Sequence, residues 1–128
     1  MKVNKGDKMI KMGYKVVNRN LRSATVANEG AVIYKVNESV YPKIGCGPLT
    51  VFKDKFAAAH FTTHLLFPSK IFRCFYIPSY AQEVWYLFDS YREDKIRVSL
   101  WALMADNYDC LIPNSVDLAC EVVLVEEV

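Results

Sequence analysis

The sequence predicts an α+β fold in which a twisted, mostly antiparallel sheet has one principal helix packed on it. Three observations support this class. Short segments alternate apolar and polar residues, which is the period of a half-buried strand. Clusters of Gly, Asn and Pro separate these segments and favour tight turns. One stretch near the middle of the chain instead has apolar residues at helical spacing.

The strands follow from the alternation and from the turns between them. Asn28, Glu29 and Gly30 favour a turn because Gly adopts positive φ without steric cost. The segment 40–48 contains two Pro and two Gly and predicts a rigid loop. The predicted strands are residues 13–18, 21–27, 31–36, 49–52, 71–77, 84–88, 96–103 and 115–125.

The helix is predicted at residues 55–66. Asp54 is suited to cap its first turn, and a run of three alanines favours helical backbone. Pro68 stops the helix because proline cannot continue one. The stripe expected to be buried against the sheet consists of Phe56, Ala57, Ala59, Phe61 and Leu65.

Length and composition predict a single domain at residues 13–128, after a basic and weakly ordered lead at residues 1–12. The chain is 52% hydrophobic, which is enough to build a core. Its positive and negative residues nearly balance, with a net charge of +2, so bulk charge does not imply nucleic-acid binding. No apolar run is long enough to span a membrane, and the lead does not resemble a secretory signal. We therefore expect a soluble, cytoplasmic protein.

The cysteines and histidines give no pattern that predicts a catalytic or metal site. Four cysteines, at 46, 74, 110 and 120, match neither a zinc knuckle nor a disulfide framework, so buried free thiols are expected. His60 and His64 share a helix face, but no glutamate lies between them as in the HExxH zinc motif. A GxSxG elbow and a phosphate-binding glycine loop are both missing from the sequence. These observations predict a protein that is not an enzyme and needs no metal or cofactor.

Three of the five arginines interrupt predicted strands: Arg22, Arg73 and Arg97. A guanidinium group is a planar fork that suits phosphate, and aromatic rings can stack a base. The aromatic residues close to these arginines are Phe72, Phe75, Tyr76 and Trp101. One interpretation is therefore a nucleotide site on the sheet. The other is that the arginines lie on a solvated sheet face while the aromatic residues fill the opposite face.

The order of the segments is similar to that of a known family. The segments are GYKVV, LRSATV, GAVIYKVNESVYPKIGCGPLTVF, AAAHF and PNSVDLACEVVLVEE. Over residues 13–128 this pattern resembles the first family of phage Thoeris anti-defence proteins. The resemblance implies a non-catalytic protein of the host cytoplasm that binds and sequesters an intact cyclic ADP-ribose isomer, glyco-cyclic ADP-ribose, made by a TIR-domain enzyme. It also implies homo-oligomers built from dimers.

The same resemblance implies the roles of individual residues. An aromatic ring stacks the adenine in that family, and arginines hold the pyrophosphate. Here Phe72 is the stacking candidate, and Arg22 and Arg97 are the phosphate candidates. Arg73 and Asn18 are further ligand-binding candidates. No catalytic residue and no nucleic-acid or membrane partner is implied.

Two other classes of function stay open. The strand 49–52 followed by a helix also resembles ADP-ribosyltransferases, in which Glu121 would be the candidate catalytic carboxylate. However, Leu49, Thr50 and Val51 match the Ser-Thr-Ser strand of those enzymes poorly. The third class is a protein-binding inhibitor module, because patches of Tyr and Trp that become buried also serve protein interfaces.

Overall fold

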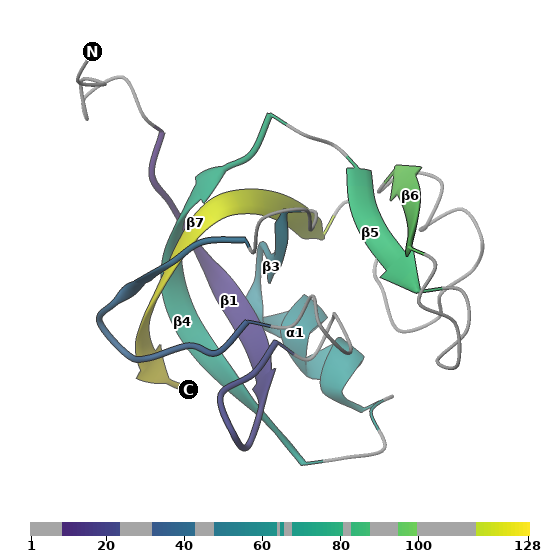
Figure 1. Ribbon diagram of the computed structural model, residues 1–128. Helices are drawn as coiled ribbons and strands as arrows, with labels where there is room; N and C mark the ends of the chain where they lie inside the picture. Colours follow the sequence, from purple (N-terminus) through teal and green to yellow (C-terminus); the bar gives the residue numbers. More distant parts are fainter. Residues whose placement is uncertain are drawn as a thin grey trace.

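A computed structural model shows a mostly β fold with one short helix in the described part of the chain (Figure 1). The structure describes residues 9–23, 32–42, 48–63, 65, 68–80, 83–87, 95–99 and 115–128. The elements are β1 (Lys11–Asn18), β2 (Ser39–Val40), β3 (Leu49–Phe52), α1 (Lys55–Thr62), β4 (Ser69–Pro78), β5 (Glu83–Leu87), β6 (Lys95–Ser99) and β7 (Val116–Glu127). Strand β1 therefore begins inside the segment 1–12 that was predicted to be a weakly ordered lead.

Four antiparallel strands close into a barrel. They pair in the order β7, β3, β1, β4, and β4 pairs again with β7, while β2 adds a short strand to β7. The long pairing between β4 and β7 has register shifts at Arg73/Cys74 and at Ile77/Pro78. Such irregularities bend a strand and increase its twist, which helps a narrow sheet to close.

The predicted class, α+β, describes this fold only loosely. The strands are antiparallel as expected, but the prediction of a twisted sheet with one principal helix is not confirmed. The sheet closes on itself, and α1 has eight residues. Strands β5 and β6 pair with each other in a separate two-stranded sheet.

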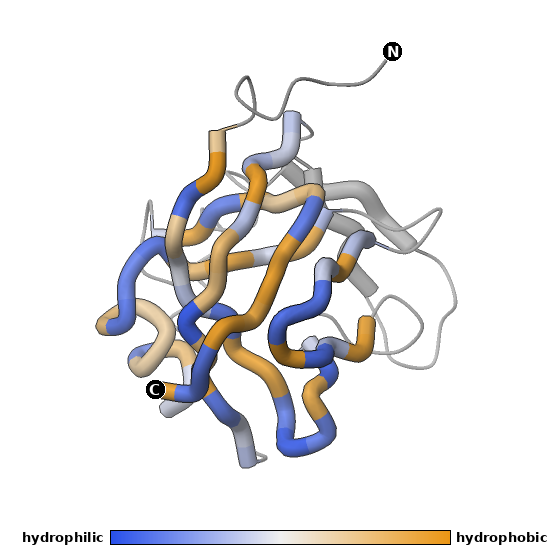
Figure 2. Tube along the Cα trace, turned by 90° about the vertical axis from the view of Figure 1, so that its left-hand side faces the viewer, coloured by the Kyte–Doolittle hydropathy of each residue, from blue (hydrophilic) through white to orange (hydrophobic). Residues whose placement is uncertain are grey.

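The barrel interior is filled by alternate residues of its strands. Phe72, Cys74 and Tyr76 of β4 are buried there with Val17 of β1. Hydrophobic residues accordingly follow the strands in Figure 2, and hydrophilic residues collect at several of the turns. Gly13 faces a crowded position, because an added Cβ would lie 2.7 Å from the backbone oxygen of Phe52. Only glycine fits at this point of β1 without movement of the backbone.

Helix α1 covers part of the outer surface of the barrel. The Asp54 carboxylate accepts a hydrogen bond from the Ala57 N–H at 2.7 Å, which confirms the predicted cap. Ala57 and Phe61 are buried as expected, and the Phe61 ring lies 5.1 Å from the Phe52 ring. The prediction was wrong for two members of the stripe: Phe56 is 75% exposed and Ala59 is also exposed. They lie on the opposite side of the helix from its buried face.

The helix ends at Thr62, four residues earlier than predicted. The hydroxyls of Thr62 and Thr63 donate to the carbonyls of Ala59 and His60, both at 2.7 Å. Threonine side chains that bond to the backbone in this way disfavour helix continuation. Leu65 nevertheless packs against the helix cluster, as the predicted stripe requires.

Two further expectations are met only in part. The predicted strands 21–27 and 31–36 form isolated bridges in the described residues, Val17 with Ser23 and Arg22 with Ile33. Of the two cysteines that the structure describes, Cys74 is buried but Cys120 is exposed. In the described segments, no helix has the length and apolar character needed to cross a membrane.

Candidate functional site

The two faces of β4 separate the predicted site residues. Side chains alternate along a strand, so Phe72 and Arg73 point to opposite sides of the barrel wall. The Phe72 ring lies in the core and is 5% exposed, whereas Phe75 is 42% exposed on the outer side. The aromatic residue that shares a face with Arg73 is therefore Phe75. In this closed fold the Phe72 ring is not accessible for stacking on a ligand.

Arg73 and Phe75 form an organised pair on the outer surface. The guanidinium carbon of Arg73 lies 5.7 Å from the centre of the Phe75 ring. The Arg73 Nε donates to a carboxylate oxygen of Glu126 at 2.9 Å, and Nη1 contacts the Met12 sulfur at 3.8 Å. We call Met12, Arg73, Phe75 and Glu126 the outer β4 site. Its flat ring and its cation are the two groups that recognise a base and a phosphate.

At this site, a row of apolar side chains runs across three neighbouring strands on the outer surface of the barrel. Met12 on β1 and Val123 on β7 lie directly opposite Phe75 in the two pairings of β4. Directly opposed residues project to the same face of a sheet. Met12 is 49% exposed and Val123 is half-buried. The row therefore offers a partly exposed apolar surface with Arg73 at its side.

The ion pair at the outer β4 site can be displaced by a stronger anion. The Arg73 side chain is 28% exposed and that of Glu126 is 59% exposed. An ion pair exposed to this degree contributes about 0–1 kcal/mol. A phosphate accepts the same kind of charge-assisted hydrogen bond and offers more oxygens to the planar guanidinium than a carboxylate does. A phosphate group can therefore compete with Glu126 for the guanidinium.

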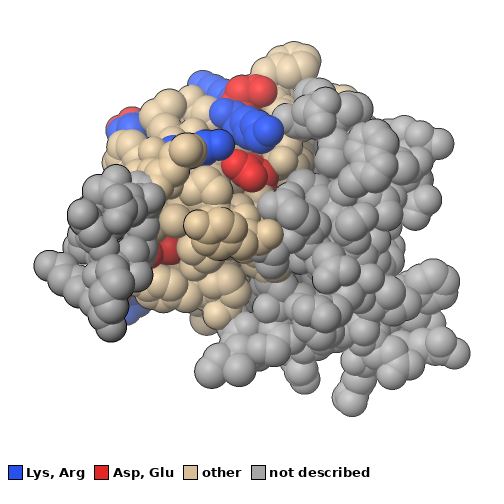
Figure 3. All heavy atoms as spheres, turned by 90° about the horizontal axis from the view of Figure 1, so that it is seen from above, with Lys and Arg blue, Asp and Glu red and all other residues tan. Residues whose placement is uncertain are grey.

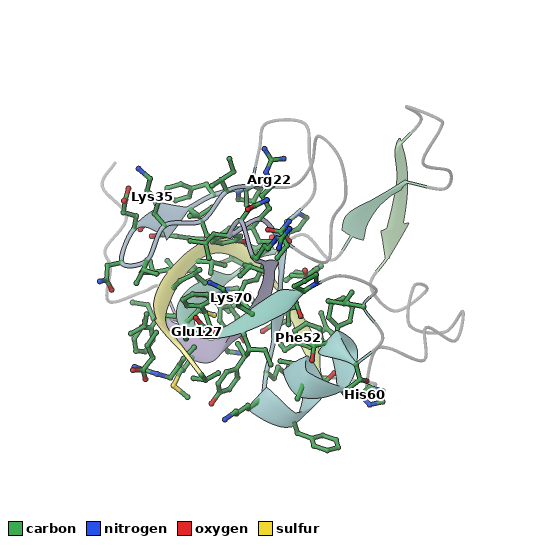
Figure 4. All side chains as sticks on the ribbon, turned by 90° about the horizontal axis from the view of Figure 1, so that it is seen from below. Arg22, Lys35, Phe52, His60, Lys70 and Glu127 are labelled. Carbon is green, nitrogen blue, oxygen red and sulfur yellow. The ribbon has the colours of Figure 1, made fainter. Side chains whose placement is uncertain are left out.

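Asn18 and Arg22 belong to a different part of the molecule. The Asn18 side-chain oxygen accepts from the backbone N–H groups of Asn20 at 2.8 Å and Arg22 at 3.1 Å, so it shapes the turn after β1. Asn18 pairs with Ser69, four strand positions from Arg73, which is about 13 Å along β4. Figure 4 shows the exposed Arg22 on the side of the barrel opposite His60 of α1.

Arg97 lies on β6, opposite Trp85 of β5. The structure describes the backbone of this hairpin but not its side chains, so the predicted phosphate contact of Arg97 lies outside the described part. Of the five predicted ligand-binding residues, the described side chains place only Arg73 in the outer β4 site. The two-residue period of the segment IFRCFYI contains the signal that pairs Arg73 with Phe75.

A second polar cluster lies inside the barrel, and the sequence interpretation missed it. Lys15 of β1 is fully buried, and its ammonium nitrogen donates to the Thr50 carbonyl at 2.7 Å. The same nitrogen lies 5.7 Å from the centre of the Tyr34 ring. Burial lowers the pKa of Lys15 to about 7, and burial raises the pKa of Cys74 to about 12.

Glu121 and Thr50, the candidate residues of an ADP-ribosyltransferase-like enzyme, contact different residues in the structure. A carboxylate oxygen of Glu121 accepts from the Ser39 hydroxyl at 2.8 Å on the β2 side of β7. The Thr50 hydroxyl instead lies 3.4 Å from the buried Lys15 nitrogen. His60 is on α1, whereas His64 lies outside the described residues. In the described part, no cluster of three His, Cys, Asp or Glu side chains has the arrangement of a metal site.

Positive and negative side chains are intermixed on the described part of the surface that Figure 3 shows. Figure 3 shows Lys and Arg side chains next to Asp and Glu side chains on the upper face. Elsewhere in the described residues, opposite charges also pair, as the Lys11 ammonium and the Asp117 carboxylate do at 3.9 Å. Among the described residues, this face therefore shows no single-sign patch of the kind that binding through phosphate charge alone requires.

No protein-family model, curated protein or solved structure matches this chain.

Proposed function

We propose that this chain is a non-catalytic nucleotide-binding protein that sequesters a cyclic ADP-ribose isomer and so inhibits host TIR-dependent Thoeris defence. The observation that carries the proposal is the packing of the Arg73 guanidinium beside the half-exposed Phe75 ring. This arrangement supplies a cation for the pyrophosphate and a ring for the adenine. The resemblance to phage Thoeris anti-defence proteins names the class of ligand.

The ligand would bind across the outer face of the barrel wall. Its adenine would stack on Phe75 and extend over the Met12 side chain, which lies opposite Phe75 on β1. Its pyrophosphate would replace Glu126 as the acceptor for Arg73. Arg22 and Arg97 remain candidates for further phosphate contacts, and Asn18 remains a further ligand-binding candidate.

A second copy of the chain would complete such an open site. The row formed by Met12, Phe75 and Val123 leaves apolar surface partly exposed to water. Contact with another subunit would bury this row and enclose a bound base. We therefore propose a homo-oligomer built from dimers. Light scattering should give a multiple of 14.7 kDa, and a particle of 14.7 kDa at micromolar concentration would contradict the assembly.

The function is tested by binding and by recovery of the ligand. Glyco-cyclic ADP-ribose, its ring isomers and linear ADP-ribose are titrated against the protein, and melting temperature and heat of binding are recorded. A cyclic isomer should stabilise the fold, because a ligand that binds only the folded state raises its stability. The complex is then denatured by heat and the released nucleotide is analysed by mass spectrometry. Intact cyclic ligand supports sequestration, whereas linear product would show that the chain is an enzyme.

A further inference from the structure

Strand pairing fixes the two neighbours of Arg73 on the outer surface of the barrel. Glu126 of β7 lies directly opposite Arg73 in one pairing, and Tyr14 of β1 lies directly opposite it in the other. Directly opposed residues project to the same face of a sheet. Tyr14 packs against the helix cluster, whereas the Glu126 side chain is 59% exposed. The guanidinium group therefore meets an exposed carboxylate on its β7 side.

The backbone on both sides of Glu126 is paired, so its carboxylate is tethered close to Arg73. The Val128 N–H donates to the Ile71 carbonyl at 2.9 Å, and the pairing between β4 and β7 thus continues past Glu126. Among the described residues, Glu126 is the one acidic residue that forms an ion pair with Arg73. A carboxylate tethered in this way acts at a high effective concentration, however dilute the protein is.

The tethered carboxylate uses the hydrogen-bonding group of Arg73 that a ligand phosphate would need. Glu126 accepts from Nε at 2.9 Å, while Nη1 contacts the Met12 sulfur at 3.8 Å. The guanidinium carbon also lies 5.7 Å from the centre of the Phe75 ring. The planar group is thus already oriented, and its charge is already paired. An incoming anion has to displace Glu126 or stay close to a second negative charge, which repels it.

We propose that Glu126 is an internal competitor that regulates the affinity of the outer β4 site. Its carboxylate holds Arg73 until an anion that binds a guanidinium group more tightly takes its place. A free carboxylate offers Arg73 only what Glu126 already supplies, whereas a phosphate offers more oxygens to the planar group. The site is thereby restricted to ligands that carry phosphate. This inference rests on the proposed function, because it requires the outer β4 site to bind an anion.

Glu126→Gln tests the competition, with inorganic pyrophosphate as the probe. Glutamine loses the charge but keeps an oxygen that can accept from Arg73 Nε. Loss of an exposed ion pair corresponds to a change of up to about fivefold in a binding constant, and loss of the repulsion adds a similar factor. Calorimetry at low ionic strength should therefore show pyrophosphate binding about five- to twentyfold tighter in Glu126→Gln than in the wild-type protein.

Glu127→Gln is the matched control, because it makes the same change in net charge at the next residue of β7. Glu127 is also exposed, but it lies opposite Phe72 and not opposite Arg73. Its substitution should tighten pyrophosphate binding by about twofold or less, through long-range charge alone. Equal affinities in the two glutamine variants, or no binding by either, would overturn the proposal.

Arg73→Met shows whether the competition acts through the guanidinium group. In this background, Glu126→Gln should no longer tighten pyrophosphate binding, because the carboxylate has no cation to occupy. A gain that persists without Arg73 would overturn the proposal.

Glyco-cyclic ADP-ribose separates this proposal from the proposed function. If no variant binds the cyclic nucleotide but Glu126→Gln binds pyrophosphate more tightly than Glu127→Gln does, the proposed function fails and the competition stands. If the wild-type protein binds the cyclic nucleotide but the two glutamine variants bind pyrophosphate equally, the proposed function stands and the competition fails.

Discussion

The two faces of β4 differ in how deeply their side chains are buried. On the inner face, Phe72 and Cys74 are buried in the core cluster, where they contribute to stability. On the outer face, Arg73 and Phe75 are partly exposed and contact each other, although packing of the core does not require them there. Neighbouring residues of the same strand are thus committed to different physical roles. Substitutions on the two faces should separate folding from binding.

The largest effect is expected on the inner face. Phe72→Ala removes a ring that is 5% exposed and should destabilise the fold by about 3–5 kcal/mol. Thermal unfolding followed by circular dichroism measures this loss, and Phe72→Leu is the milder control. A Phe72→Ala variant with a normal melting temperature would contradict the placement of this ring in the core. If that variant also lost affinity, Phe72 would regain the stacking role that the resemblance implies.

The next effect concerns affinity and not stability. Arg73→Ala should weaken binding of the cyclic nucleotide by about one to two orders of magnitude, because a charge-assisted bond contributes about 1.5–3 kcal/mol. Calorimetry measures this change. Arg19→Ala is the matched control, because it removes an exposed arginine in the turn after β1 that is not a candidate ligand contact. Equal losses in both variants would indicate a general effect of charge and would remove the special role of Arg73.

The helix cap offers a third and smaller change. Asp54→Ala removes the carboxylate that accepts from the Ala57 N–H, and should cost about 1 kcal/mol of stability. Asp54→Asn retains an acceptor and should recover most of the loss. Urea unfolding compares the three proteins. An effect of Asp54→Ala on nucleotide affinity beyond that loss of stability would link α1 to the binding site, which the outer β4 site does not predict.

The smallest expected effect lies at the buried Tyr34 hydroxyl. Within the described residues this group has no hydrogen-bond partner, so Tyr34→Phe removes a buried polar atom at little cost. Stability should stay equal or rise by up to about 1 kcal/mol. Chemical unfolding at constant pH measures the difference. A loss of more than about 1 kcal/mol would show that the hydroxyl is satisfied in solution, for instance by a buried water.

The sequence predicts individual strands and the helix better than it predicts the closure of the sheet into a barrel. The short segment LTVF predicts β3 at residues 49–52 as a buried strand, and the cap at Asp54 predicts the start of α1. Closure of the barrel depends on pairing between β4 and β7 with two register shifts. Such contacts join residues far apart in the chain and leave no local pattern. A lysine in a strand normally indicates the solvent face, so local reasoning also missed the buried position of Lys15.

Part of the candidate site could be predicted from the sequence. Arg73 is a strand arginine with aromatic neighbours in the sequence, and the structure places Phe75 on its face while Phe72 and Tyr76 fill the opposite face. The choice of Phe72 followed the family resemblance, although the two-residue period places Phe75 on the face of Arg73. Glu126 and Met12 lie far from Arg73 in the sequence and reach it only through strand pairing.

Phe75→Ala is the most direct test of the proposed binding role of the outer β4 site. Glyco-cyclic ADP-ribose is titrated into the wild-type protein and into Phe75→Ala, and the melting temperature of each protein is measured on the same sample. Loss of a stacked ring should reduce affinity by about one to two orders of magnitude, since stacking contributes about 1–3 kcal/mol. The melting temperature without ligand should stay within a few degrees, because Phe75 lies outside the core. Unchanged affinity in Phe75→Ala would contradict the outer β4 site.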